Sequence, residues 1–293
     1  MSTPTVGVLG LGPMGAPVAG HLARAGFPLR VWNRTRAKAA AFGAAAVGHP
    51  AQLCAEVVLS ALPDVDHFER IAPDPVLDTW AGRGTTHVVV LSTTAPDKVR
   101  GLAVRLARFG LAVVDAPMSG GDAGARAGTL SLMVGAGDED FATVEPVLRT
   151  FSSTVEHLGP VGAGTAAKLC NQIVVATTLV GLAEALDLAR RAGLSGSQLV
   201  RVLEAGLASS AVLEAKAAKI LQREYGLGGS TDNQVKDLRY ALALADRLGA
   251  RLAQTRQTAA LFEATVRNGL GAADHSAVYE TVSEDRYPRA APS

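Results

Sequence analysis

The chain has 293 residues, of which 48% are hydrophobic and 19% are charged, and its formal net charge is +1. This length suggests about two domains, and the apolar content predicts an ordered, globular protein rather than a disordered one. The balanced charge, with no long run of one sign, argues against nucleic acid or an anionic membrane as the main partner. With those partners disfavoured, we expect the protein to act on a small molecule.

The first apolar run begins at Val6 and leads directly into glycines. From this we expect no signal or transit peptide and a cytoplasmic location. The two cysteines, Cys54 and Cys170, cannot form a disulfide framework, and no cluster of potential ligands has metal-ligand spacing. We therefore expect no metal site and two small, buried cysteines.

Short runs rich in Val and Leu alternate with helix-compatible stretches in the first half of the chain. The predicted strands are 5–9, 29–32, 57–62, 87–92, 111–116 and 130–135, and stretches such as 14–25 and 96–109 are predicted helices. This alternation is typical of βαβ units on a mainly parallel sheet.

Beyond Gly164 the strand pattern stops and helical periodicity takes over. The predicted helices are 164–192, 196–205, 211–224, 231–248, 252–268 and 274–284. The apolar segment 173–186 contains Glu184, and it is too short and too charged for a membrane span. It fits better as a helix buried between domains or subunits. The sequence thus predicts an α/β domain over 1–163 and an all-helical domain over 164–293.

The segment VGVLGLGPMG, residues 6–15, places a G-x-G-x-x-G motif between a predicted strand and a predicted helix. Gly10 would permit the tight turn, Gly12 the approach of a pyrophosphate, and Gly15 the close packing of the helix. The helix N-terminus would then offer N–H groups to the phosphates. This context predicts dinucleotide binding rather than a purely structural glycine turn. The residues concerned are Gly10, Leu11, Gly12, Pro13, Met14 and Gly15.

An NAD-binding unit would place an acidic residue about 20 positions later. This chain instead has Asn33, Arg34 and Thr35. Asn33 carries no charge to repel a 2′-phosphate, and the Arg34 guanidinium can pair with one. Thr35 can both hydrogen-bond and cap the next helix. NADP is therefore the favoured cofactor, with NAD and an ordinary turn into a helix as the alternatives.

The segment DAPMSGGDAGARAGTL, residues 115–130, contains Ser119, Gly120 and Gly121 after a predicted strand. One hydroxyl and two backbone N–H groups there could form a concavity for an anion such as a carboxylate. A flexible loop between strands is the alternative.

The segment GPVGAGTAAKLCNQ, residues 159–172, places Lys168, Asn171 and Gln172 on one face of a helix that begins near Gly164. An ammonium beside an amide suits a carbonyl that becomes an alkoxide: Lys168 would donate the proton and one of the amides would orient the substrate. A lysine with the usual pKa of about 10.4 is protonated near neutrality, so oxidation of an alcohol should accelerate at alkaline pH. A surface lysine is the alternative.

The segment 231–249 is predicted as an amphipathic helix capped by Asp232. The six histidines are scattered, with no carboxylate or cysteine nearby in the sequence. We assign none of them a catalytic role.

Taken together and in this order, the motifs resemble the β-hydroxyacid dehydrogenase family, which includes 3-hydroxyisobutyrate dehydrogenases and tartronate semialdehyde reductases. The segments LP at 62–63, STT at 92–94 and KDLRYAL at 236–242 extend the resemblance over nearly the whole chain. It implies a doubly wound Rossmann domain, an all-helical domain, and homodimers or homotetramers formed through the latter.

The resemblance also implies roles for individual residues. Lys168 would be the catalytic acid/base, with Asn171 as its substrate-orienting neighbour. Ser119, Gly120 and Gly121 would hold the substrate carboxylate. The remaining cofactor contacts would be Leu62, Pro63, Thr93 and Lys236.

Two departures bear on the substrate. Some members carry asparagine where this chain has Gln172, so it stays open whether Asn171 or Gln172 contacts the substrate. The glycine-rich segment 225–234 lacks the aromatic residue expected before Lys236.

The sequence predicts an NADP-preferring oxidoreductase that interconverts a short β-hydroxy acid and its aldehyde or ketone. The alternatives are an imine reductase-like enzyme and a non-catalytic dinucleotide-binding scaffold, and Lys168 argues against both. A 6-phosphogluconate dehydrogenase would be much longer than this chain.

Overall fold

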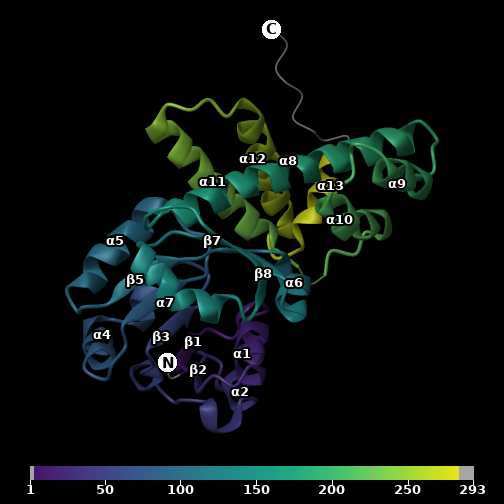
Figure 1. The fold of residues 1–293 in the computed structure, drawn as a ribbon. Helices are drawn as coiled ribbons and strands as arrows, with labels where there is room; N and C mark the ends of the chain where they lie inside the picture. Colours follow the sequence, from purple (N-terminus) through teal and green to yellow (C-terminus); the bar gives the residue numbers. More distant parts are fainter. Residues whose placement is uncertain (1–2, 227, 284–293) are drawn as a thin grey trace. The chain divides into compact units, whose positions relative to one another are not determined.

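The computed structural model describes residues 3–226 and 228–283 (Figure 1). The chain divides into two compact units, Met1–Lys168 and Leu169–Ser293, and helix α8 (Ala163–Arg191) begins in the first and continues through the second.

The first unit is built on a five-stranded parallel sheet. Its strands are β1 (Val6–Leu9), β2 (Leu29–Trp32), β3 (Val57–Ser60), β4 (His87–Val90) and β5 (Ala112–Asp115). They lie in the order β2-β1-β3-β4-β5. Beyond β2, Ala46 forms a single parallel bridge with Val31, where a six-stranded Rossmann sheet has a further strand. With that bridge counted, the order is the doubly wound one, and the predicted fold class is confirmed.

Helices cover both faces of this sheet because its central strands are apolar on both sides. In β3, Val57 and Leu59 pack in one buried cluster with Val18 of α1 (Gly15–Arg24), while Val58 packs in another with Trp80 of α4 (Asp74–Ala81). The helices of this unit are α1 (Gly15–Arg24), α2 (Arg36–Ala40), α3 (Val65–Ile71), α4 (Asp74–Ala81), α5 (Pro96–Ala107), α6 (Gly121–Ala127) and α7 (Asp138–Leu148).

A second, three-stranded sheet has the order β6-β7-β8, with β6 antiparallel and β8 parallel to β7. Its strands are β6 (Met118–Ser119), β7 (Leu130–Val134) and β8 (Ser152–His157). The predicted strands omitted β6 and β8. Ser153, Thr154 and Glu156 of β8 are exposed, so that strand lacks the apolar run on which the prediction relied.

The second unit is helical, as predicted. After α8 come α9 (Gly196–Ala205), α10 (Ala211–Gln222), α11 (Thr231–Leu248), α12 (Ala253–Thr265), a π-turn at Val266–Leu270, a 3₁₀ turn at His275–Ala277 and α13 (Val278–Ser283). Its core joins Leu179 and Ala183 of α8 to Leu238 of α11 and Phe262 of α12.

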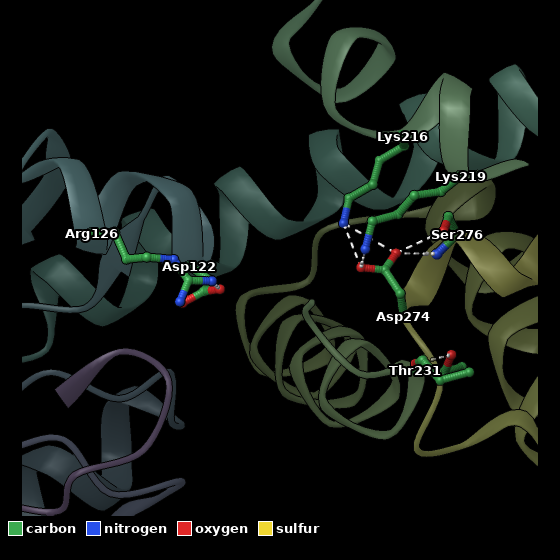
Figure 2. A network of polar contacts seen from close by, with 8 residues as sticks. Asp122, Arg126, Lys216, Lys219, Thr231, Asp274 and Ser276 are labelled. Atoms are coloured by element: carbon green, nitrogen blue, oxygen red, sulfur yellow. Dashed lines mark hydrogen bonds and ion pairs between the residues drawn. The ribbon is translucent and has the colours of Figure 1, made fainter. Parts of the chain in front are cut away.

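The predicted helix 274–284 is wrong at its start, and its last residue lies outside the described residues. Asp274 is the N-cap of the 3₁₀ turn, and its carboxylate accepts hydrogen bonds from the Ser276 backbone N–H at 3.0 Å and hydroxyl at 2.7 Å. Lys216 and Lys219 of α10 point at the same carboxylate, at 2.8 and 3.0 Å (Figure 2). This buried network holds the chain in a turn where a helix was expected.

Two smaller predictions are corrected by local geometry. The hydroxyl of Ser230, and not Asp232, caps α11 by accepting a hydrogen bond from the Asn233 N–H, so Asp232 lies within the first turn. Cys54 is buried as expected, but Cys170 is exposed because it lies on the face of α8 opposite Lys168.

Helix α8 extends well beyond the apolar segment 173–186. With 29 residues and a mean hydropathy of 1.5 in its most apolar window, it is long and apolar enough to cross a membrane by length and composition alone. From the sequence we judged only the inner segment, residues 173–186, to be too short and too charged for a membrane span. The core helices of water-soluble proteins meet the same test, so this finding is weak evidence for a membrane span.

Candidate active site

The glycine-rich turn after β1 has the backbone that a pyrophosphate site requires. Gly10 has a φ of +100°, which favours glycine, and a Cβ on Gly15 would collide with the carbonyl oxygen of Gly10. A Cβ on Gly12 would meet no atom within 4 Å, so the backbone there is open to an approaching ligand. The turn therefore fits the phosphates of a dinucleotide at the N-terminus of α1.

The segment after β2 is tied to this turn. The Asn33 side-chain oxygen accepts a hydrogen bond of 2.8 Å from the Leu11 N–H, and its nitrogen donates one of 3.0 Å to the Thr35 carbonyl. Thr35 is the N-cap of α2, but its side chain makes no capping hydrogen bond, so its expected capping role is not observed.

Arg34 and Arg36 are both exposed beside this segment. Within the described part of the chain neither has an ion-pair partner, and α2 has no acidic residue in its first turn. Two unpaired cations at a helix N-terminus are favourable only where an anion can approach. Arg36 was missed from the sequence, although it stands two residues after Arg34 in the same motif.

The loops that follow β3 and β4 are linked by a buried carboxylate. Asp64 accepts hydrogen bonds from the Val65 N–H at 2.6 Å and from the Thr94 hydroxyl at 2.5 Å. The link fixes the loop that carries Leu62 and Pro63 against the loop that carries Thr93. Sequence reasoning missed Asp64 and Thr94, which directly follow the residues that it selected.

The loop after β5 contains two glycines in conformations that other residues rarely adopt. Gly120 has a φ of +118° and Gly121 a φ of +60°, and α6 starts at Gly121. Ser119 precedes them in β6, so its position is fixed by pairing with β7. The three residues predicted to hold a carboxylate therefore form one turn between β6 and α6.

The same β5 segment anchors the N-terminus of α8. The Asp115 carboxylate is fully buried and accepts hydrogen bonds of 2.6 Å from the N–H groups of Gly162 and Thr165. Burial raises the pKa of the Asp115 carboxyl, and the hydrogen bonds from these two N–H groups oppose that shift. Lys168, one turn further along α8, is only 6% exposed, which excludes a freely solvated surface lysine.

Further along α8, Gln172 contacts α11. Its side-chain nitrogen donates a hydrogen bond of 2.7 Å to the Asp237 carboxylate, and the Lys236 ammonium lies 3.3 Å from the other oxygen of Asp237. Asn171 is half-buried on the same helix. Asp237 was not among the predicted site residues, although it directly follows Lys236 in the sequence.

The predicted site residues carry ammonium, hydroxyl and amide groups, which can serve acid/base chemistry. Among residues 3–226 and 228–283, no group of three or more His, Cys, Asp and Glu side chains could hold a metal ion. The fold and these groups define a dinucleotide-binding oxidoreductase.

Comparison with known proteins identifies the family. Residues 5–159 match the NAD-binding domain of 6-phosphogluconate dehydrogenase, and residues 162–282 match the domain described as NAD-binding of NADP-dependent 3-hydroxyisobutyrate dehydrogenase. The 2-hydroxy-3-oxopropionate reductase of Escherichia coli strain K12 is 32% identical over 281 residues, covering 94% of this chain and 96% of the relative. The chain belongs to the β-hydroxyacid dehydrogenase family, as its sequence motifs predicted.

Solved structures agree with this assignment. A Mycobacterium tuberculosis 3-hydroxyisobutyrate dehydrogenase, solved with L-serine, is 28% identical with a TM-score of 0.84, covering 97% of this chain and all of that one. Psf3, in complex with NADP⁺ and 2-OPP, is 25% identical with a TM-score of 0.85, covering 95% of this chain and all of Psf3. An imine reductase from Streptomyces aurantiacus is more distant, with a TM-score of 0.65 over 96% of this chain and all of that one; at 22% identity it shares the fold alone.

Proposed function

We propose that this protein transfers a hydride between NADP(H) and a short β-hydroxy acid or the corresponding semialdehyde, with Lys168 as the acid/base. The burial of Lys168 one turn into α8 is the observation that carries the proposal. Lysine is seldom buried in a folded protein, and a lysine at this position matches the family motif.

Each of the predicted site residues has its own role in the proposed reaction. The turn at residues 119–121 holds the substrate carboxylate, because its hydroxyl and glycine backbone suit an anion. Asn171 orients the reacting oxygen. Lys168 gives that oxygen a proton as the ammonium in reduction and takes a proton from it as the neutral amine in oxidation. When bound, the nicotinamide supplies or accepts the hydride. Leu62, Pro63, Thr93 and Lys236 remain predicted contacts of the cofactor.

The preference for NADP over NAD is part of the proposal. Arg34 and Arg36 support it, because both are exposed at the end of β2, where a Rossmann domain holds the adenosine ribose. A guanidinium recognises a phosphate by paired, charge-assisted hydrogen bonds. An NAD-specific site would instead place a carboxylate there.

A homodimer or homotetramer formed through the helical unit also belongs to the proposal. Val174 and Leu188 of α8 are 62% and 70% exposed, which is unusual for large apolar side chains on a central helix. A second copy of the chain would cover them. The cytoplasmic location remains a prediction from the sequence.

A substrate panel tests the proposed reaction. Short hydroxy acids and semialdehydes are assayed with NADPH and NADH, using wild type and Lys168→Ala. We expect turnover with NADPH and a loss of at least about 1,000-fold in Lys168→Ala. Retention of most of the turnover by Lys168→Ala would refute the acid/base role, and activity only on imines would refute the substrate class.

A further inference from the structure

We propose that Asp115 is a positioning residue for the reaction, holding Lys168 and the Ser119 loop in one fixed relationship. The inference rests on the proposed function. It concerns a carboxylate that touches neither the substrate nor the cofactor in the roles assigned above.

Asp115 is the junction of three backbone segments. Its side chain accepts hydrogen bonds of 2.6 Å from the N–H of Gly162, just before α8, and from the N–H of Thr165, in the first turn of α8. Its backbone exchanges two hydrogen bonds with Gly135, of 3.0 and 2.7 Å, just after β7. Ser119 lies four residues after Asp115, and Lys168 lies three residues after Thr165. The loop that carries Ser119 and the helix that carries Lys168 are therefore both connected to Asp115.

The packing leaves the start of α8 little freedom to slide or rotate. A Cβ added to Gly164 would collide with the Met133 carbonyl oxygen and approach the Asp115 carbonyl oxygen to 2.8 Å. The helix backbone thus lies directly against β5 and β7, and the Asp115 carboxylate fixes its axial position. Proton transfer is sensitive to such placement, because a displacement of about 1 Å can lower a rate by about 100-fold.

The test is Asp115→Asn, which keeps the side-chain shape but turns an NH₂ group toward one of the two N–H donors. We expect kcat to fall by about 100-fold, while the dissociation constant for NADPH stays within about threefold of wild type. The pH at which oxidation accelerates should also shift, because Lys168 changes its surroundings. Val147→Ala is the matched control: it truncates a buried residue of α7 in the same unit, and its kcat should stay near that of wild type.

A double mutant separates positioning from a general structural role. In a Lys168→Ala background, Asp115→Asn should cause almost no further loss, because the two residues act as a unit. An undiminished additional loss would overturn the inference, and so would a kcat and pH profile in Asp115→Asn that match those of Val147→Ala. If Lys168→Ala itself keeps its turnover, the proposed function fails instead.

If Asp115→Asn does not fold, Asp115→Ser takes its place in every assay. Its hydroxyl can still accept a hydrogen bond from one helix N–H, as serine does at N-caps. The same loss of kcat with retained NADPH binding is expected, and a wild-type kcat would overturn the inference.

Discussion

Gln172 on α8 donates a hydrogen bond of 2.7 Å from its side-chain nitrogen to the carboxylate of Asp237 on α11. Asp237 is only 5% exposed, so this carboxylate depends on its neighbours for compensation. The nitrogen of the Gln172 amide is occupied by that task. Gln172 therefore stabilises Asp237, and we propose Asn171, as the family motif implies, for the amide that orients the substrate.

This division predicts different effects for the two residues. Gln172→Leu should lower the free energy of unfolding by about 1–3 kcal/mol, because Asp237 loses a donor while it stays buried. Asn171→Ala should lower kcat/KM by at least about tenfold, more than Gln172→Leu does. Chemical denaturation and steady-state kinetics on both variants measure the two effects, and the reverse pattern would contradict the assignment.

The exposed Arg34 and Arg36 predict the cofactor preference. Replacing both Arg34 and Arg36 by alanine should lower kcat/KM for NADPH by about 10- to 100-fold and change that for NADH little, since only NADPH carries the 2′-phosphate. Arg30→Ala is the control on the preceding strand, β2, because the Arg30 guanidinium donates a hydrogen bond to the Gln52 carbonyl. Equal losses of kcat/KM with NADPH and NADH would show that the arginines do not recognise the 2′-phosphate.

The network around Asp274 predicts that substitution of this residue has a large effect on stability. Asp274 is distant in the sequence from every residue proposed to act in catalysis. Asp274→Asn should lower the free energy of unfolding by roughly 3 kcal/mol, because it leaves two partly buried ammonium groups without their counter-ion. Asp246→Asn is the matched control, since the Asp246–Arg256 pair is more than half exposed and should contribute almost nothing. Denaturant titration of both variants measures the difference, and equal stabilities would refute the prediction.

The same network predicts how stability depends on pH. Burial alone would raise the pKa of the Asp274 carboxyl, but the hydrogen bonds from Lys216 and Ser276 and the charge of Lys216 hold it well below its usual range. Its contribution is therefore fully present above the unfolded-state value of about 3.9 and is lost as the pH falls below it. Between pH 5 and pH 2, wild type should lose more stability than Asp274→Asn. Parallel curves for the two proteins would exclude Asp274 as the titrating group.

Much of the fold follows from local patterns. Strands β1 to β5 and β7 are rich in Val, Leu and other apolar residues, and glycines separate the helices of the second unit, so both patterns were visible in the sequence. β8 was not, because exposed Ser153, Thr154 and Glu156 interrupt its apolar pattern. The turn at Asp274 was missed for a different reason: the lysines that hold it lie 55 to 58 residues away.

The site divides in the same way. The glycine turn, Asn33 and Lys168 stand in local motifs, so the chemistry proposed for them could be predicted from residue type and spacing. The roles of Asp64 and Asp115 could not be predicted in this way, because they depend on hydroxyl and N–H donors that lie 30 to 50 residues away in the sequence. Partners brought together by topology leave no local sequence pattern.

The acid/base role of Lys168 predicts opposite pH trends for the two directions of the reaction. Oxidation of the alcohol needs the neutral amine, so its rate should rise from neutral to alkaline pH, while reduction should slow over the same range. Initial rates of both directions at saturating cofactor measure the trends. A flat oxidation profile would count against Lys168, provided that NADP⁺ binding is shown to be constant over the range.

The exposed apolar side chains of α8 predict the effect of a charge on assembly. Leu188→Glu, alone or with Val174→Glu, should convert the assembly to a monomer of about 30.1 kDa in light scattering, because a buried charge at an interface is strongly unfavourable. Val104→Glu is the control, since Val104 is 73% exposed on α5 of the first unit and should leave the mass unchanged. An unchanged mass in the α8 variants would place the interface elsewhere, and a monomeric wild type would refute the proposed assembly altogether.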